Sequence, residues 1–392
     1  MSITLSTRSE RIQPSPTLVI SAKAMALKRQ GVDVISLSAG EPDFDTPDFI
    51  KDAAILAIQQ GFTKYTAVDG IPELKQAIVD KFKKDNNLDY KLSQVLVSCG
   101  GKQSCYNLAQ AILNPGDEVI IPAPYWVSYP AFAELADARP VYIKAAIDQQ
   151  FKITPRQLEA AITAKTKLLY LNSPSNPTGV AYTAEELAAL GKVLKNHPRV
   201  VIGTDDMYEK ILWTPEPFVN ILNVCPELYD RTVILHGVSK AYSMTGWRIG
   251  YAAGPQNVIS AMEKIQSQST SNPTSIAQKA AAAALTGDQS CIDVMVKAFK
   301  ERHEYLVEAL NSLPGVKCSR SDGTFYSFPC VEEAMRKHGF TNDTAFCEFL
   351  LDKARVAVVP GSAFGMDGYM RLSFATSMEL LKKAIERMRE IL

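Results

Sequence analysis

The stretch TKLLYLNSPSNPTGVAYTAEELAALGKVLKNHPRVVIGTDDMY, residues 166–208, contains two short β-rich runs joined by a helical segment. KLLYLN and RVVIGT both have strand length and are largely apolar, as the buried strands of a parallel sheet are. The helix between them is expected to start at Thr183, because Thr183 and Glu186 form the capping-box pattern. A strand, a helix and a second strand predict a parallel sheet.

The same alternation continues on both sides of this stretch. QVLVS, EVIIP and TVILH are further runs of strand length, with helical segments between several of them. An amphipathic helix is expected over residues 48–60, with Phe49, Ala53, Leu56 and Ala57 on one stripe, and another from Pro72 onward, with Leu74, Ile78 and Phe82 on its stripe. The pattern predicts an α/β fold with a mostly parallel sheet between layers of helices.

The two ends of the chain differ from this middle part. Pro14 and Pro16 are expected to prevent a regular start, and with the turn-rich GEPDFDTP at 40–47 they predict an N-terminal arm and a short connection. A long charged helix is expected from about Asp293, and a final helix carries Leu381, Ala384, Ile385 and Met388 on one face. We therefore expect an arm and small-domain segment at 1–45, a large domain at 46–285 and a small α+β domain at 286–392.

Composition limits the kinds of partner. The 392 residues contain 42 Lys plus Arg and 42 Asp plus Glu, so the net charge is zero and no basic face for nucleic acid is implied. The seven cysteines are spread singly, which argues against a disulfide framework or a metal site and favours a reducing compartment. No run approaches the roughly 20 apolar residues of a membrane span. These features predict a cytoplasmic protein that acts on small molecules.

Distinctive residues follow four of the five predicted strands, beginning with QVLVS and KLLYLN. Ligands of parallel α/β sheets bind outside the carboxyl ends of the strands. After QVLVS, Gly100, Gly101 and Lys102 lead into a helix, which can form an anion cup or a simple glycine turn. After KLLYLN, a proline-braced loop carries Asn176, whose amide could donate to a phenolate oxygen, although the loop could equally be a rigid turn.

The next two strand ends carry ionisable groups. After RVVIGT, Asp205 could keep a pyridine nitrogen protonated and Tyr208 could reach the hydroxyl of the same ring, although a helix cap is the simpler interpretation. After TVILH, burial would leave Lys240 an amine free for imine formation, and Arg248 could pair with a phosphate. A lone lysine there is usually solvated. Together, however, the four strand ends supply the parts that one cofactor, pyridoxal phosphate, requires.

Several motifs carry a resemblance to a known family. They are KYTAVDGIPEL (64–74), GGKQ (100–103), PYWVSYP (124–130), NSPSNPTG (172–179), TDDMY (204–208) and SKAYSMTGWRIGY (239–251). In this order and at these separations they resemble class I pyridoxal-phosphate aminotransferases of fold type I, over essentially the whole chain. The resemblance is strongest to the prokaryotic aspartate aminotransferases, which are homodimers.

The resemblance implies a role for each matching residue. Lys240 would form the Schiff base with the cofactor, Asp205 would pair with its pyridine nitrogen, and Tyr208 would donate to its ring oxygen. The other implied cofactor contacts are Gly100, Gly101, Lys102, Trp126, Asn176, Ser239, Arg248 and, from the neighbouring subunit, Tyr65. The implied substrate contacts are Arg371, which would grip the α-carboxylate, with Gly40, Trp126 and Asn176.

The expected reaction moves the amino group of L-aspartate, or a similar amino acid, to 2-oxoglutarate with ping-pong kinetics. An aromatic, alanine or kynurenine aminotransferase, or a carbon–sulfur lyase, is the alternative on the same fold. A transcription regulator is disfavoured because only about forty residues precede the sheet domain, too few for a DNA-binding one. A nicotinamide enzyme is disfavoured because no strand is followed by Gly-x-Gly-x-x-Gly.

Four departures from the family leave the substrate open. No arginine lies between Arg248 and Arg302 to bind a side-chain carboxylate. Gln13 stands where relatives that also accept prephenate have lysine, which puts that second activity in doubt. Gly237 replaces a phosphate-binding serine, and Asp206 replaces a glutamate. His236, just before the lysine loop, is the histidine nearest the expected site.

Overall fold

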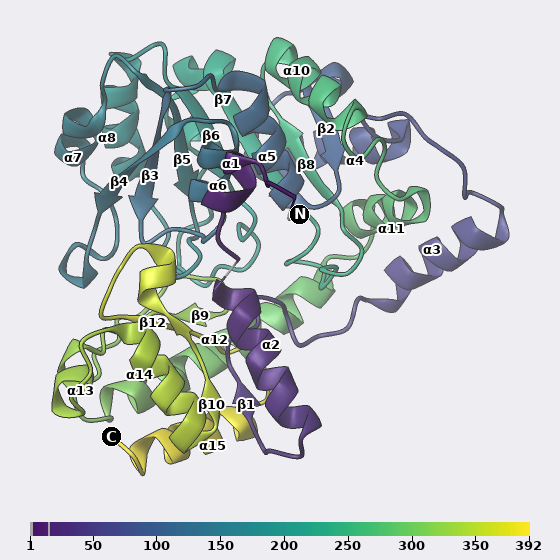
Figure 1. Ribbon diagram of the computed structural model, residues 1–392. Helices are drawn as coiled ribbons and strands as arrows, with labels where there is room; N and C mark the ends of the chain where they lie inside the picture. The colour runs from purple at the N-terminus through teal and green to yellow at the C-terminus, as the bar shows by residue number, and fades with distance from the viewer. Residues whose placement is uncertain (1–2, 15) are drawn as a thin grey trace.

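A seven-stranded β-sheet forms the centre of the structure, a computed structural model that describes residues 3–14 and 16–392 (Figure 1). In spatial order the strands are β2 (Val95–Ser98), β8 (Gly250–Ala253), β7 (Thr232–Gly237), β6 (Val201–Asp205), β5 (Thr166–Asn172), β3 (Glu118–Ala123) and β4 (Arg139–Lys144). β8 runs antiparallel to both of its neighbours, and the other pairs are parallel. The predicted mostly parallel sheet is confirmed.

Helices cover both faces of this sheet because its strands are apolar on both sides. Ile202 and Ile234 point to one face, where they pack with the helices α4 (Pro72–Asn86), α7 (Pro155–Ala161), α8 (Ala184–Lys195), α9 (Ile221–Val224) and α11 (Ser275–Thr286). Val233 and Leu235 point to the other, where they pack with α5 (Gly101–Ile112), α6 (Tyr129–Leu135) and α10 (Gln256–Ser267). The result is a three-layer α/β arrangement.

The register of the central strands brings three strand ends together. Asn172 at the end of β5 pairs with Asp205 at the end of β6, and Asp205 pairs with Leu235 near the end of β7. Side chains that follow these strands therefore start from one edge of the sheet, as ligand-binding residues of such folds do.

The C-terminal part has its own apolar core, to which the N-terminal segment is joined. It contains α12 (Ser290–Asn311), α13 (Glu332–Lys337), α14 (Asp343–Phe349) and α15 (Met378–Arg389), with a three-stranded antiparallel sheet of β11 (Val359–Pro360), β12 (Met370–Ser373) and β9 (Tyr326–Ser327). The strand β1 (Ile35–Ser36) pairs in parallel with β10 (Val356–Ala357). Residues from opposite ends of the chain thus share one layer (Figure 1).

Most of the predicted helices are confirmed, with one correction. Thr183 caps α8 through the amide of Glu186, and the predicted stripes of α4 and α15 are buried. In contrast, α3 (Asp48–Gln59) buries Ile50, Ala54 and Ala57, whereas the predicted stripe residue Leu56 is exposed. The prediction was wrong because the helix projects outward from the sheet layers (Figure 1), so apolar residues remain on its outer side.

The N-terminal arm is more regular than predicted. It contains α1 (Thr7–Arg11) and α2 (Pro16–Arg29), although two prolines had been expected to prevent regular structure. Proline is favourable at the first position of a helix, because the N–H that it lacks has no partner there. No helix in the described ranges is long and apolar enough to cross a membrane.

Candidate active site

A cavity of about 370 Å³ lies at the carboxyl ends of β5, β6 and β7, bordered by the C-terminal part of the chain. This volume lies within the range of small-molecule sites. The structure brings eleven of the thirteen predicted site residues to its wall: Gly40, Gly101, Lys102, Trp126, Asn176, Asp205, Tyr208, Ser239, Lys240, Arg248 and Arg371. Residues 371 and 40 join residues 101–248 there because the C-terminal part packs against the sheet edge.

Lys240 supplies the cavity with an amine that lies close to the carbonyl of Gly40. Its Nζ donates a hydrogen bond to the carbonyl of Gly40 at 2.6 Å. Burial lowers the pKa of this ammonium to about 8, and the positive charges of Arg371 and Arg248 act in the same direction. A larger fraction of the side chain is therefore the neutral, nucleophilic amine near neutral pH than for an exposed lysine.

Asp205 is the buried carboxylate of the cavity. The hydroxyl of Tyr129 donates to its Oδ2 at 2.6 Å, and the backbone N–H of Met207 donates to its Oδ1 at 3.3 Å. Burial raises the pKa of Asp205, while these two hydrogen bonds lower it in part. A cationic ligand group beside Asp205 would stabilise the ionised carboxylate.

Arg371 links the C-terminal part to the sheet edge. Its Nη1 donates to Oδ1 of Asn176 at 3.0 Å, and its Nη2 donates to the carbonyl of Ser38 at 2.8 Å. Its Nε is buried without a hydrogen-bond partner among the described residues, and the guanidinium lies 4.4 Å from the ring centroid of Tyr326. The hydroxyls of Tyr326 and Tyr208 are 3.1 Å apart. Asn176 thus accepts with its oxygen, which leaves its NH₂ available to donate.

The helix start after β2 has the shape of an anion cup. Gly100 has a φ of +90° and caps the twelve-residue helix α5. A Cβ on Gly100 would lie 2.4 Å from Nη2 of Arg248, so both the backbone conformation and the close approach of the guanidinium require glycine. The N-terminus of a helix beside an arginine is a favourable place for a phosphate.

The other two predicted site residues, Gly100 and Tyr65, lie outside the cavity wall, as do Gly237 and Asp206, which depart from the family pattern. Tyr65 is 92% exposed and does not line the cavity of its own chain. A Cβ on Gly237 would lie 3.0 Å from the carbonyl oxygen of Ile249, so this residue packs against β8. Asp206 accepts a hydrogen bond from the Thr204 hydroxyl at 2.6 Å. Neither Asp206 nor Gly237 lines the cavity.

The site also contains residues that were not predicted from the sequence. Thr17, Leu18, Asn172 and Tyr326 line the cavity, and Tyr129 supports Asp205 from behind it. Tyr129 lies in the quoted PYWVSYP motif, so a signal was available, but nothing in the local sequence around Tyr326 relates it to the sheet edge.

The donors and acceptors of the cavity fit pyridoxal phosphate. The cavity offers a low-pKa amine for an aldehyde, a buried carboxylate for a ring nitrogen, phenol and amide donors for a ring oxygen, and an arginine at a helix N-terminus for a phosphate. An anion would complete the hydrogen bonding of two groups: the backbone N–H groups of the anion cup at Gly100, and the Nε of Arg371, which has no partner among the described residues.

These features define a pyridoxal-phosphate enzyme, and comparison with known families shows that it is an aminotransferase. The model of the aminotransferase class I and II family matches residues 32–388, and the chain belongs to this family, whose members depend on pyridoxal phosphate.

Similar proteins narrow the class further. An aspartate/prephenate aminotransferase of Nitrosomonas europaea is 58% identical over 99% of both chains. The structure of an aspartate aminotransferase from Rhizobium meliloti superposes with a TM-score of 0.94 at 45% identity, covering 99% of this chain and 98% of that one. An aspartate aminotransferase from Thermus thermophilus with maleate gives a TM-score of 0.94 at 42% identity over the whole of both chains.

Proposed function

We propose that this aminotransferase transfers the amino group of L-aspartate to 2-oxoglutarate by a ping-pong reaction. The observation that carries the proposal is that the wall of the cavity that contains Lys240 has two cations, Arg371 and Lys102, in addition to Arg248 at the phosphate position. A dicarboxylic substrate needs one cation for each carboxylate. The names of the similar proteins from Nitrosomonas, Rhizobium and Thermus support the same substrate class.

Arg371 would bind the α-carboxylate, because its planar donors match the two oxygens and its Nε has no other partner among the described residues. Lys102 would bind the second carboxylate. Its ammonium lies 5.2 Å from the ring centroid of Trp126, and no arginine occurs between Arg248 and Arg302 to do so. The backbone N–H groups at Gly101 and Lys102 would remain in the phosphate cup.

The remaining roles follow from the chemistry of each side chain. When bound, pyridoxal phosphate supplies an aldehyde that bonds to amines and a ring that accepts electrons released at the substrate Cα. Lys240 would bind the aldehyde between turnovers and move the proton from the substrate Cα. Asp205 would keep the ring nitrogen protonated. Tyr208 and Asn176 would donate to the ring oxygen.

Three further residues would hold the cofactor in place. The indole of Trp126 would cover the face of the ring. Ser239 and Arg248 would bind the phosphate together with the cup at Gly100.

A panel of amino donors with 2-oxoglutarate as acceptor tests the substrate proposal. Aspartate should give the highest kcat/KM, ahead of alanine, phenylalanine, kynurenine and cystathionine. Lys102→Gln should reduce kcat/KM for aspartate about tenfold or more by loss of a charge-assisted contact, and leave that for alanine within about twofold. Equal losses for both donors would remove Lys102 from the proposed role.

Prephenate belongs in the acceptor panel because the Nitrosomonas relative is named for both substrates. Gln13 is exposed and lies outside the cavity wall, and it lacks the charge that a second carboxylate would use. We therefore expect activity with prephenate well below that with 2-oxoglutarate.

The assembly and domain division belong to the same proposal. We propose a homodimer in which Tyr65 reaches the phosphate of the neighbouring subunit. The exposed Ile55, Leu56 and Ile58 on α3 support it, because adjacent exposed apolar residues are typical of interfaces. We propose a large domain at 46–285 and a small domain formed by 286–392 together with the 1–45 segment. The separate apolar cores of the two parts support this division. The singly spaced cysteines favour the cytoplasm.

A further inference from the structure

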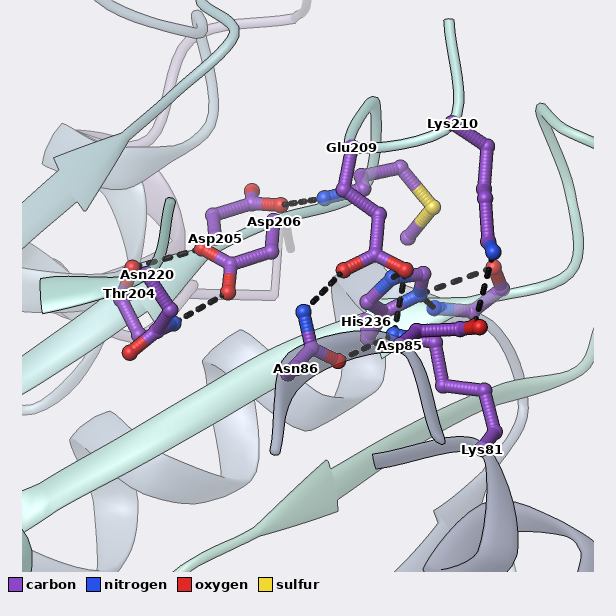
Figure 2. A network of polar contacts seen from close by, with 12 residues as sticks. Lys81, Asp85, Asn86, Thr204, Asp205, Asp206, Glu209, Lys210, Asn220 and His236 are labelled. Carbon is purple, nitrogen blue, oxygen red and sulfur yellow. Dashed lines mark hydrogen bonds and ion pairs between the residues drawn. The ribbon is translucent and has the colours of Figure 1, made fainter. Parts of the chain in front are cut away.

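An ionic cluster of Lys81, Glu209 and His236 is buried beside the cavity (Figure 2). Their side chains are only 4%, 3% and 4% exposed. Oε1 of Glu209 contacts the ammonium of Lys81 and lies 3.3 Å from Nε2 of His236, while Oε2 accepts a hydrogen bond from Asn86 at 3.0 Å. None of these residues lines the cavity.

Stability alone does not explain this cluster. Removing charged groups from water costs several kcal/mol per ion, and apolar residues of similar volume often stabilise a protein as well as a buried ion pair does. The position of the cluster is informative. Glu209 directly follows Tyr208, and His236 lies four residues before Lys240, so the cluster connects the two turns that carry the principal groups of the cavity.

His236 acts on the backbone through a defined ring nitrogen. The N–H of Gly237 donates to Nδ1 at 2.7 Å, so Nδ1 is an acceptor, and Nε2 lies 3.3 Å from Oε1 of Glu209. The ring stacks on Tyr251 with centroids 5.1 Å apart and an interplanar angle of 3°, and Phe82 contacts it edge-on. The ring orientation is thus fixed, and the amide that Nδ1 contacts belongs to Gly237, the last residue of β7 before the turn to Lys240.

We propose that His236 is a positioning residue for the reaction: its Nδ1 fixes the start of the Lys240 turn, and its Nε2, through Glu209, ties that turn to the one that carries Asp205 and Tyr208. The inference rests on the proposed roles of Lys240 and Asp205. Groups that hold a reactive residue within a fraction of an ångström affect turnover without touching the substrate.

Two substitutions at one position separate positioning from packing. His236→Asn keeps an oxygen that can accept from a neighbouring backbone N–H but loses the stacked ring. His236→Phe keeps a ring to stack on Tyr251 but has no acceptor. Positioning predicts that the Phe variant is the poorer enzyme, whereas simple packing predicts that the Asn variant is.

For His236→Phe we expect kcat to fall roughly ten- to a hundredfold with KM within about twofold, as for other residues that orient a reactive group. The dissociation constant of pyridoxal phosphate from the apoenzyme, followed by equilibrium titration, should rise about tenfold. His236→Asn should retain most of the wild-type kcat and most of the wild-type affinity for pyridoxal phosphate. Wild-type kcat and cofactor affinity in the Phe variant, or a larger loss in the Asn variant, would overturn the proposal.

A double variant tests whether the cluster acts through charge alone. Lys81→Met with Glu209→Met leaves no charge in the cluster and no acceptor for Nε2 of His236. It is expected to unfold at nearly the wild-type temperature yet to remain slow, because the tie between the turns is lost. Recovery of wild-type kcat would show that only charge balance matters, against the proposal.

The exposed pair of His197 and Glu159, 3.0 Å apart, provides a matched control. Glu159→Gln should change neither kcat nor cofactor affinity, and losses equal to those of His236→Phe would count against the proposal. Lys240→Ala separates this inference from the function itself. If Lys240→Ala is inactive while His236→Phe behaves as wild type, only the positioning role fails. If Lys240→Ala is active, the proposed function fails first.

Discussion

The cavity wall and the buried cluster each contain a lysine and a carboxylate, and the two carboxylates are in opposite electrostatic states. Asp205 lines the cavity, while Glu209, four residues further along the chain, does not. Burial raises the pKa of Asp205 and lowers that of Lys240, so the charged form of each is disfavoured. Burial alone would also raise the pKa of Glu209, but the charge of Lys81 and the contact with His236 outweigh it and hold that pKa below its ordinary range.

The difference distinguishes a ligand site from a support. A buried charge whose partners are all in the protein has nothing left to offer a ligand, and its removal affects folding. A buried group that lacks a full set of partners gains most when a ligand arrives, as is common in active sites. Substitutions in the two regions should therefore affect different measurements.

Lys240→Ala should have the largest effect and should act on turnover alone. Loss of the amine that binds the aldehyde and moves the Cα proton should reduce kcat about 10⁴-fold or more. Because the substitution removes a cation whose charged form is disfavoured by burial, the free energy of unfolding of the apoenzyme should be unchanged or higher. Steady-state assays and denaturant unfolding measure the two quantities, and borohydride reduction of the native enzyme should label Lys240. A label on another residue would contradict the assignment.

Lys81→Met should have the next largest effect, and on stability. It leaves Glu209 buried without its main counter-charge, and breaking a buried pair in this way typically costs about 3–5 kcal/mol. Chemical denaturation of the apoenzyme measures the loss. A cost below 1 kcal/mol, typical of exposed pairs, would mean that the two regions do not differ as described.

The cavity side of this comparison could be predicted from the sequence, because it depends on the periodic pattern of apolar residues in the strands. Long apolar strands and the residues directly after them were identified, because the ends of neighbouring parallel strands must meet. The strand β8 and the edge strand β4 were missed. The first, GYAA, consists mostly of glycine and alanine, which are uncommon in strands, and the second, RPVYIK, begins with Arg-Pro and buries only one residue. The outer face of α3 was assigned wrongly because periodicity does not tell which of two apolar stripes finds a partner.

The support of the site was beyond prediction for a different reason. Glu209, His236 and Tyr129 were visible as residues, but their roles depend on contacts with Lys81, Gly237 and Asp205 that arise only when separate elements pack. Tyr326 reaches Tyr208 from 118 residues away. Strand ends can be inferred from local pattern, whereas the partner of a buried polar group is set by tertiary structure.

Arg371→Lys should reduce kcat/KM for aspartate about a hundredfold, because an ammonium cannot replace the planar fork that binds a carboxylate with two parallel hydrogen bonds. The charge is retained, so the loss measures geometry. Initial rates over a range of aspartate concentrations measure it. A loss below about threefold would indicate that Arg371 serves mainly as a structural link to Asn176 and Ser38, as the residues of the buried cluster do.

Tyr129→Phe should have the smallest effect and should depend on pH. Burial raises the pKa of Asp205, and the hydrogen bond from Tyr129 is the largest influence that lowers it, so removal of the hydroxyl should raise that pKa further. The ionised carboxylate is then lost at a higher pH, and the acidic limb of the kcat profile should move upward. We expect kcat to fall about tenfold on that limb, by loss of one hydrogen bond to a charged group, and to approach the wild-type value at alkaline pH.

Tyr170→Phe is the matched control for this shift. Tyr170 stacks on Tyr129 with ring centroids 4.7 Å apart, but its hydroxyl donates to the carbonyl of Cys105 at 3.0 Å and makes no hydrogen bond to Asp205 in the described structure. Loss of the Tyr170 hydroxyl should leave the acidic limb of the kcat profile at the same pH as in the wild type. Equal displacement in both variants would mean that Asp205 responds to packing of the aromatic pair, in which case the cavity carboxylate would be held by its surroundings as firmly as Glu209 is.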